Sequence, residues 1–245
     1  ARAELCRIKP VFMLAEAEHR DLHDRAFDAT YGWSWNLALH HIASGRADVT
    51  ALRVYHAEHE KSFPDDGMRM LFVSNHDKNS WEGTEFEQFG DALEVAVVLS
   101  VVSDGIPLVY NGQEAGNEKR LEFFDRDPIE WREHPMGDVY RRLIALKSAN
   151  QALWNGRWGG RMVEVRTDRP DRALAFVRRA DAEAVLVVVN LSADAAQVTL
   201  TSGPCAGTWT QVQPDGGAGG QVAVAPGDVL ELPAWGYRLY VQGPT

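Results

Sequence analysis

The pattern of apolar and polar positions divides the chain into two parts near residue 154. In the first part, short apolar runs alternate with segments whose apolar residues recur at helical spacing, which predicts βαβ units and a parallel sheet. In the second part, short segments rich in β-branched and aromatic residues follow one another, which predicts an antiparallel β-sandwich. We therefore expect an α/β domain over residues 1–153 and an all-β domain over residues 154–245.

The first part contains four apolar runs that are typical of buried strands, with helical segments between them. The expected strands cover residues 9–15, 26–31, 68–73 and 106–110. Thr84 and Glu87 give the best helix signal, a capping box that opens an apolar segment ending at Gly105. The other expected helices are one capped by Ser34 and closed by Gly45, one that starts near Asp48, and one that contains Val139, Leu143 and Leu146.

The second part contains eight short segments with strand character, several of which alternate apolar and polar residues. They cover residues 162–165, 174–178, 185–191, 198–200, 209–212, 222–224, 230–232 and 237–241. Turn residues lie between them, so we expect each segment to pair with an antiparallel neighbour.

Polar side chains follow three of the four strands expected in the first part. Glu16 and Glu18 follow the first strand, residues 75–77 (Asn-His-Asp) the third, and residues 111–114 (Asn-Gly-Gln-Glu) the fourth. The carboxyl ends of parallel strands meet at one edge, where α/β enzymes place catalytic groups, so we expect these residues to face one mouth. Several carboxylates there suit glycosidic bond cleavage, because one protonates the leaving oxygen and another stabilises the positive centre. The competing explanation is that they form turns and cap helices, and for Glu18 and Glu114 it is equally good.

Composition narrows the class of ligand. The 245 residues include 35 acidic and 25 basic ones, and the net charge of −10 argues against nucleic acid or an anionic membrane as the main partner. No apolar segment is long enough to span a bilayer, and no phosphate-binding loop or HExxH motif occurs, so the sequence identifies no cofactor and no metal site. Cys6 and Cys205 match no metal or redox spacing and leave the cellular compartment open.

Trp33, Trp81 and Tyr110 are of the type that stacks on sugar rings, although ordinary packing is the simpler explanation for any one of them.

Three of these segments resemble conserved elements of the α-amylase family, glycoside hydrolase family 13. Residues 72–77 (Phe-Val-Ser-Asn-His-Asp) resemble its fourth conserved region, and residues 105–114 resemble the G-x-P-x-x-x-x-G-x-E element of its eighth barrel strand. Residues 12–16 resemble the region at the fifth strand that ends in the general acid, and the terminal β-sandwich is similar to the family's domain C. The resemblance covers nearly the whole chain and implies the C-terminal half of a (β/α)8 TIM barrel followed by an antiparallel β-sandwich domain.

The resemblance also implies a retaining hydrolase that acts on the α-glucosidic bonds of starch-like α-glucans or maltooligosaccharides. The expected site residues are the acid/base Glu16, the transition-state stabiliser Asp77, and the substrate-binding residues Asn75, His76, Trp81 and Tyr110. Family members usually have glycine before the acid, whereas this chain has Ala15, which leaves Glu18 as a less favoured competitor.

The family's nucleophile, an aspartate in a G-x-R-x-D motif on the fourth barrel strand, has no counterpart in these residues. Four barrel strands are predicted where about eight close a barrel. We therefore expect the missing N-terminal half, with the nucleophile and any calcium site of the full-length protein, to lie before Ala1 or on another chain. Two alternatives stay open: a transglycosylase or a trehalose- or sucrose-acting relative, and a non-catalytic carbohydrate-binding or accessory protein that keeps part of the site. Linkage and chain-length preference are not determined by these residues.

Overall fold

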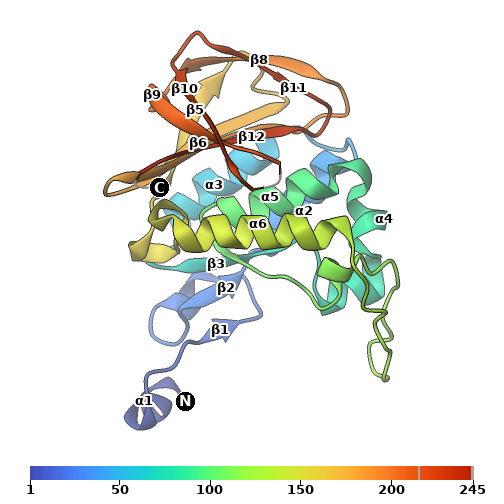
Figure 1. Cartoon of the computed structure of the whole chain (residues 1–245). Helices are drawn as coiled ribbons and strands as arrows, with labels where there is room; N and C mark the ends of the chain where they lie inside the picture. Colours follow the sequence, from blue (N-terminus) through green and yellow to red (C-terminus); the bar gives the residue numbers. More distant parts are fainter. Residues whose placement is uncertain (215, 244–245) are drawn as a thin grey trace.

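The computed structural model describes residues 1–214 and 216–243 and has three layers (Figure 1). A small parallel sheet forms one outer layer, a larger antiparallel sheet forms the other, and helices lie between them. The fold predicted from the hydrophobic pattern, an α/β part followed by an all-β part, is confirmed.

The first sheet contains four parallel strands in chain order. They are β1 (Leu14–Ala15), β2 (Ala29–Tyr31), β3 (Met68–Leu71) and β4 (Ile106–Pro107). Each is shorter than the apolar run that predicted it, because neighbouring strands pair over only two or three residues. Among the described residues, β1 and β4 each pair on one side only, so both edges of this sheet are open.

The helices confirm one predicted cap and correct another. The α-helices are α1 (Arg2–Ile8), α2 (Trp33–Ala43), α3 (Thr50–Ser62), α4 (Glu85–Phe89), α5 (Leu93–Val102) and α6 (Pro135–Ala149). Thr84 and Glu87 form the predicted capping box, in which each side chain accepts a hydrogen bond from the other's backbone N–H. Ser34, predicted as an N-cap, lies inside the first turn of α2, and Gly32 holds the cap position.

Shorter helical turns connect these elements. They are η1 (Arg20–His23), the π-helical turn η2 (Lys78–Glu82), η3 (Gly90–Ala92), η4 (Gln113–Ala115), η5 (Gln151–Leu153) and η6 (Gly156–Trp158). The segment after the capping box was expected to be one helix, but Gly90 takes a φ of +50° and η3 separates α4 from α5. The left-handed backbone at Gly90 ends α4 because it cannot continue a right-handed helix.

Helix α5 lies between the two sheets. All of its residues except Glu94 are buried, as expected for a helix covered on every side. One hydrophobic core runs from Leu71 of β3 through α5 to side chains of the second sheet such as Phe176 and Val187. The two parts of the chain therefore share a continuous core, and the boundary near residue 154 stays a prediction.

The second sheet contains all eight predicted strands, and every pairing within it is antiparallel. They are β5 (Met162–Thr167), β6 (Ala173–Ala180), β7 (Glu183–Asn190), β8 (Ala196–Ser202), β9 (Gly207–Val212), β10 (Ala218–Val224), β11 (Val229–Leu232) and β12 (Tyr237–Gln242). The strand order is β10-β9-β12-β7-β6-β5-β8-β11. A second core contains Trp209 and Val224 from one end of this order and Leu200 and Leu232 from the other. The sandwich is thus formed by one sheet that curls over itself (Figure 1).

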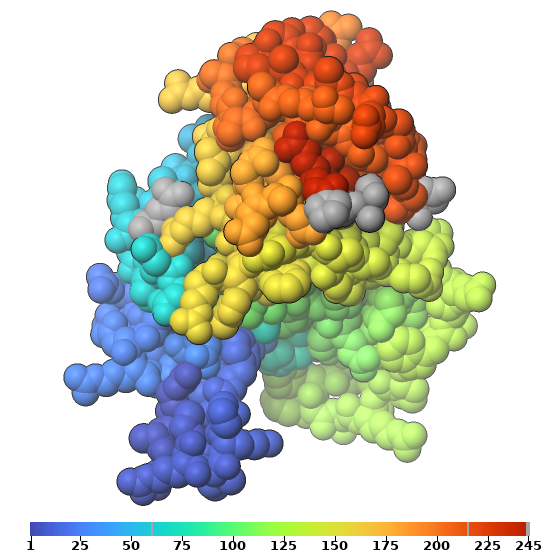
Figure 2. Space-filling view, turned by 60° about the vertical axis from the view of Figure 1, so that its left-hand side comes forward, coloured from blue at the N-terminus to red at the C-terminus, as the bar shows by residue number. Residues whose placement is uncertain are grey.

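Helix α1 protrudes from the body at the end opposite the second sheet (Figures 1 and 2). None of its residues is buried, and Leu5, Ile8 and the following Phe12 expose apolar side chains just before edge strand β1. Arg2 holds the helix to the sheet through hydrogen bonds of 2.7 and 2.8 Å to the carboxylate of Asp28. Within the described part of the chain, no helix has the length and apolarity needed to cross a bilayer.

Candidate active site

The ends of β1 and β3 place three chemically active side chains at one edge of the parallel sheet. Glu16 directly follows β1, and His76 and Asp77 form a helical turn that leads into η2. The chain before that turn is fixed by Asn36 of α2, which is buried and donates hydrogen bonds to the carbonyls of Phe72 (2.9 Å) and Val73 (3.2 Å). The turn therefore starts from a rigid strand end, as a catalytic group requires.

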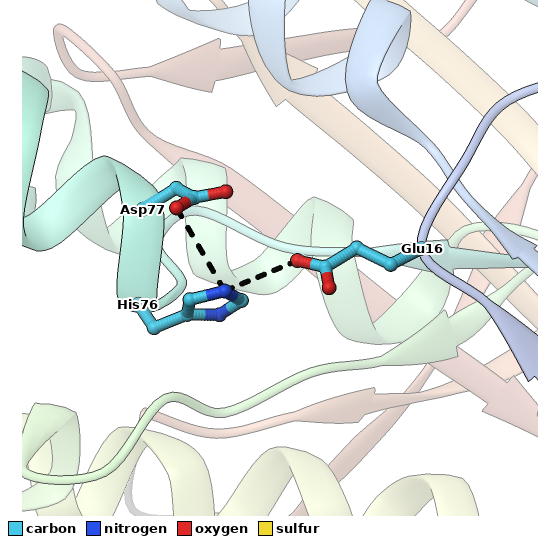
Figure 3. A group of neighbouring side chains, drawn as sticks. All are labelled: Glu16, His76 and Asp77. Carbon is cyan, nitrogen blue, oxygen red and sulfur yellow. Dashed lines mark ion pairs between the residues drawn. The ribbon is translucent and has the colours of Figure 1, made fainter.

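Glu16, His76 and Asp77 point toward one another (Figure 3). The Nε2 atom of His76 lies 3.2 Å from the Glu16 carboxylate and 3.8 Å from the Asp77 carboxylate. The three side chains are 47%, 42% and 41% exposed in that order, so a ligand in solution can reach them. We refer to them as the candidate catalytic group, shortened below to the catalytic group.

The catalytic group also has donor atoms of the kind that bind metal ions. One oxygen or nitrogen from each side chain lies within 4.8 Å of the other two. Half-exposed carboxylates commonly lie this close without an ion, and the sequence around them has no metal motif. Two carboxylates from different strands beside one imidazole fit general acid/base chemistry at least as well.

Tyr31, the last residue of β2, lies close to the catalytic group. It is buried, and its ring stacks on Trp33 (5.5 Å between centroids) and meets Phe72 edge-on (5.4 Å). Burial raises the pKa of the Tyr31 phenol, and the negative charges of Glu16 and Asp77 raise it further. The phenol therefore stays protonated near neutral pH. The sequence analysis missed this residue, although its place at the end of the strand between β1 and β3 was a usable signal.

Glu18, the competitor for the acid/base role, is held by other partners. Its carboxylate accepts hydrogen bonds from the backbone N–H (2.7 Å) and hydroxyl (2.8 Å) of Ser34 in the first turn of α2. It also forms an ion pair with Arg69, whose side chain is 2% exposed. These contacts hold the Glu18 side chain against the first turn of α2 and against Arg69. The capping explanation holds for Glu18, and Glu16 is the carboxylate after β1 that faces His76.

The cluster after β4 does not join the catalytic group. The buried side chain of Gln113 donates a hydrogen bond to Glu85 and accepts one from the backbone N–H of Tyr110. Glu114 is exposed and lines a groove along α6 instead. Tyr110 is half-buried, and burial raises the pKa of its phenol. The first two strand-end clusters thus contribute Glu16, His76 and Asp77 to the catalytic group, whereas Gln113 and Glu114 of the third have other surroundings.

Two of the expected substrate-binding residues have very different surroundings. Asn75 is 1% exposed, and its Oδ1 accepts a hydrogen bond of 2.8 Å from the backbone N–H of Lys78, as an N-cap does. Trp81 on η2 is 60% exposed, and its ring lies 5.2 Å from that of Phe123. Phe123 in turn lies 5.7 Å from the ring of His76. Asn75 thus shapes the turn that presents His76 and Asp77, whereas Trp81 is open to a ligand.

Comparison with known proteins bears on the family and the fold of the chain. Residues 164–242 match the family described as the α-amylase C-terminal all-β domain. The chain is 25% identical over 145 residues to the protein named α-amylase 2 of Dictyoglomus thermophilum, and 27% identical over 188 residues to α-amylase MalA of Haloarcula japonica. These alignments cover 54% and 75% of this chain but only 24% and 27% of the relatives, so the chain spans about a quarter of their length.

A solved structure gives the same relationship in three dimensions. The whole chain superposes on 57% of the maltogenic α-amylase AmyB from Thermotoga neapolitana, with a TM-score of 0.82 and 20% sequence identity. The arrangement of two sheets with helices between them therefore also occurs in that solved structure, where it makes up 57% of a longer chain.

Proposed function

Because the chain has the C-terminal region of the α-amylase family, we propose that it forms the acid/base side of the active site of a retaining glycoside hydrolase for α-glucans. The substrate class would be starch-like α-glucans or maltooligosaccharides. The observation that supports this most directly is the convergence of Glu16 and Asp77, from two different strands, on the ring of His76.

Each member of the catalytic group has a distinct role in this proposal. In the first step, Glu16 as a carboxylic acid donates its proton to the glycosidic oxygen. At the same time, the bond between that oxygen and the anomeric carbon breaks, and a nucleophilic carboxylate forms a bond to the anomeric carbon. Glu16 as a carboxylate then takes a proton from water, whose oxygen replaces the nucleophile. Asp77 accepts hydrogen bonds from sugar hydroxyls and stabilises the oxocarbenium-like transition state. His76 hydrogen-bonds the same sugar.

The nucleophile in this proposal comes from outside these 245 residues. No G-x-R-x-D motif occurs in them, and β1 and β4 are open edges among the described residues. Strands that pair with those edges would close a barrel around the mouth and bring a further carboxylate to it. The partner implied is the N-terminal half of the barrel.

The test is the variant Glu16→Gln in the full natural polypeptide, with Glu114→Gln as the matched control. Both changes remove one exposed carboxylate and keep the side-chain shape, but Glu114 lies outside the catalytic group. We expect Glu16→Gln to lose turnover of maltooligosaccharides by about 100-fold or more, the contribution of a general acid, and Glu114→Gln to retain it. Near-normal turnover in Glu16→Gln would refute the assignment.

Two alternatives make different predictions for the same protein. A transglycosylase would transfer glucosyl units to an added sugar acceptor, and product analysis with and without that acceptor separates transfer from hydrolysis. A non-catalytic carbohydrate-binding protein would bind maltooligosaccharides without turnover. The absence of a nucleophile motif from these residues is the feature that favours this second alternative.

A further inference from the structure

We propose that Phe123, Phe124 and Trp81 form an aromatic platform on which an α-glucan stacks as it leaves the catalytic group. The inference rests on the proposed function and adds to it a binding surface for the sugar residues next to the one that reacts. Phe123 and Phe124 were not among the candidates from the sequence.

The three rings form one exposed cluster. The centroids of Phe123 and Phe124 lie 4.8 Å apart, those of Trp81 and Phe123 5.2 Å, and those of Trp81 and Phe124 6.3 Å. Trp81 is 60% exposed and Phe124 is 84% exposed. Exposed apolar surface of this kind is stabilised when a ligand covers it. Pyranose rings present flat C–H patches that fit the face of an aromatic ring.

The platform is continuous with the catalytic group. The ring of Phe123 lies 5.7 Å from that of His76, and His76 contacts both Glu16 and Asp77. A chain with one sugar at the Glu16 carboxylate therefore meets Phe123 next, and the other two rings beyond it.

Hydrogen bonds fix the platform before any ligand arrives. The two phenylalanines lie on the segment between η4 and α6, which binds η2, the turn that also bears Trp81. Asn79, only 4% exposed, accepts a hydrogen bond from the backbone N–H of Leu121 (2.7 Å) and donates one to the carbonyl of Lys119 (3.2 Å). Ser80 donates a bond of 2.7 Å to the carbonyl of Leu121. A surface already ordered loses little entropy when it binds a ligand.

The size of the platform and the residues next to it favour a sugar rather than a protein as its ligand. Three side chains are far fewer than the roughly 20–30 residues that each side of a stable protein interface contributes. The neighbours of the two phenylalanines in the sequence include exposed charged side chains, those of Glu122, Asp125 and Arg126. Apolar faces bordered by hydrogen-bonding groups match a ligand with apolar faces and hydroxyl edges.

The experiment measures binding of maltohexaose to the full natural polypeptide by isothermal titration calorimetry, in the Glu16→Gln background so that turnover does not consume the ligand, with cellohexaose as the β-linked comparison. The variants are Phe124→Ala and the double variant Phe123→Ala/Phe124→Ala. Trp131→Ala is the matched control, because Trp131 lies on the same segment, is 60% exposed and has no ring contact with the platform among the described residues. We expect Phe124→Ala to weaken maltohexaose binding about five- to tenfold, the loss of one aromatic contact, and the double variant to weaken it further. Trp131→Ala is expected to bind as the wild type does.

Several results would overturn the platform. Equal affinity of the wild type and the double variant for maltohexaose is one, and equal weakening in Trp131→Ala is another. A wild-type dimer that becomes monomeric in Phe124→Ala by light scattering would assign the rings to contact between copies instead.

Failure of the platform and failure of the proposed function give different results. If the full polypeptide hydrolyses maltohexaose but the phenylalanine variants leave its KM unchanged, the platform is wrong and the function stands. If these variants weaken binding but Glu16→Gln hydrolyses as fast as the wild type, the platform stands and the assigned chemistry is wrong.

Discussion

The buried amine of Lys147 makes the stability of this fold depend on pH in a direction that can be calculated. Lys147 of α6 is 8% exposed, and its Nζ donates to the carbonyls of Val101 (3.1 Å), Gly105 (3.1 Å) and Leu153 (2.6 Å). Burial, together with the nearby positive charge of Arg178, lowers the pKa of Lys147 from 10.5 to about 7. The amine joins α6 to the end of α5 and to the segment that enters the second sheet.

A lowered pKa means that the unfolded chain binds this proton more tightly than the folded chain does. Stability therefore rises with pH between the folded pKa, near 7, and the unfolded one, near 10.5. Between pH 7 and pH 9 the folded amine loses most of its protons while the unfolded amine keeps them, which adds about 2 kcal/mol to the free energy of unfolding. The neutral amine keeps two N–H donors, so no more than one of its three carbonyl partners loses a bond.

The assay is urea denaturation at pH 7 and at pH 9 for the wild type and for Lys147→Met, which cannot titrate. We expect the free energy of unfolding to rise by about 2 kcal/mol more in the wild type than in the variant. Lys61→Met is the control, because the Lys61 side chain is 74% exposed, and its pH dependence should match that of the wild type. Parallel pH dependence in the wild type and Lys147→Met would refute the reasoning.

Two further predictions concern buried charges. Glu85 is 3% exposed, and burial raises its pKa to about 7, so stability falls as pH rises from the unfolded pKa, near 4.5, to about 7. Between pH 5 and pH 8, the free energy of unfolding measured by thermal denaturation should fall by about 2–3 kcal/mol in the wild type. This fall should be absent from Glu85→Gln, whose amide oxygen still accepts a hydrogen bond from Gln113 but cannot titrate. Arg178 is fully buried, and its guanidinium donates to several backbone carbonyls, among them Ser103 (2.7 Å) and Trp154 (2.6 Å). Arg178→Lys cannot reach them all and should lower the free energy of unfolding by about 3 kcal/mol in urea, whereas the exposed neighbour change Arg179→Lys should lower it by under about 0.5 kcal/mol.

Local sequence was enough to locate the candidate site. Glu16, His76 and Asp77 follow apolar runs, and parallel strands bring their carboxyl ends together whatever their exact lengths. The capping box at Thr84 was also predictable, because both partners lie within one turn. These features depend on residues that are close in sequence or on a rule of topology.

Features that depend on contacts between distant segments could not be predicted from the sequence. Glu18 is paired with Arg69, a partner 51 residues away, so no local pattern could distinguish it from Glu16. The platform depends on a hydrogen bond between Asn79 and Leu121, which are 42 residues apart, and Phe123 lies in a segment with no periodic pattern. The curl of the second sheet likewise follows from its shared core rather than from any one strand.

The central claim is that Glu16 donates the proton to the leaving oxygen, and pre-steady-state kinetics tests it most directly. In the full natural polypeptide, Glu16→Gln should lose steady-state turnover on maltohexaose and also on α-glucosyl fluoride, because water activation in the second step needs the same carboxylate. Fluoride needs no protonation to leave, so the variant should still release one equivalent of fluoride per active site in a rapid burst. Loss of the burst together with turnover, or wild-type turnover of maltohexaose, would contradict the assignment.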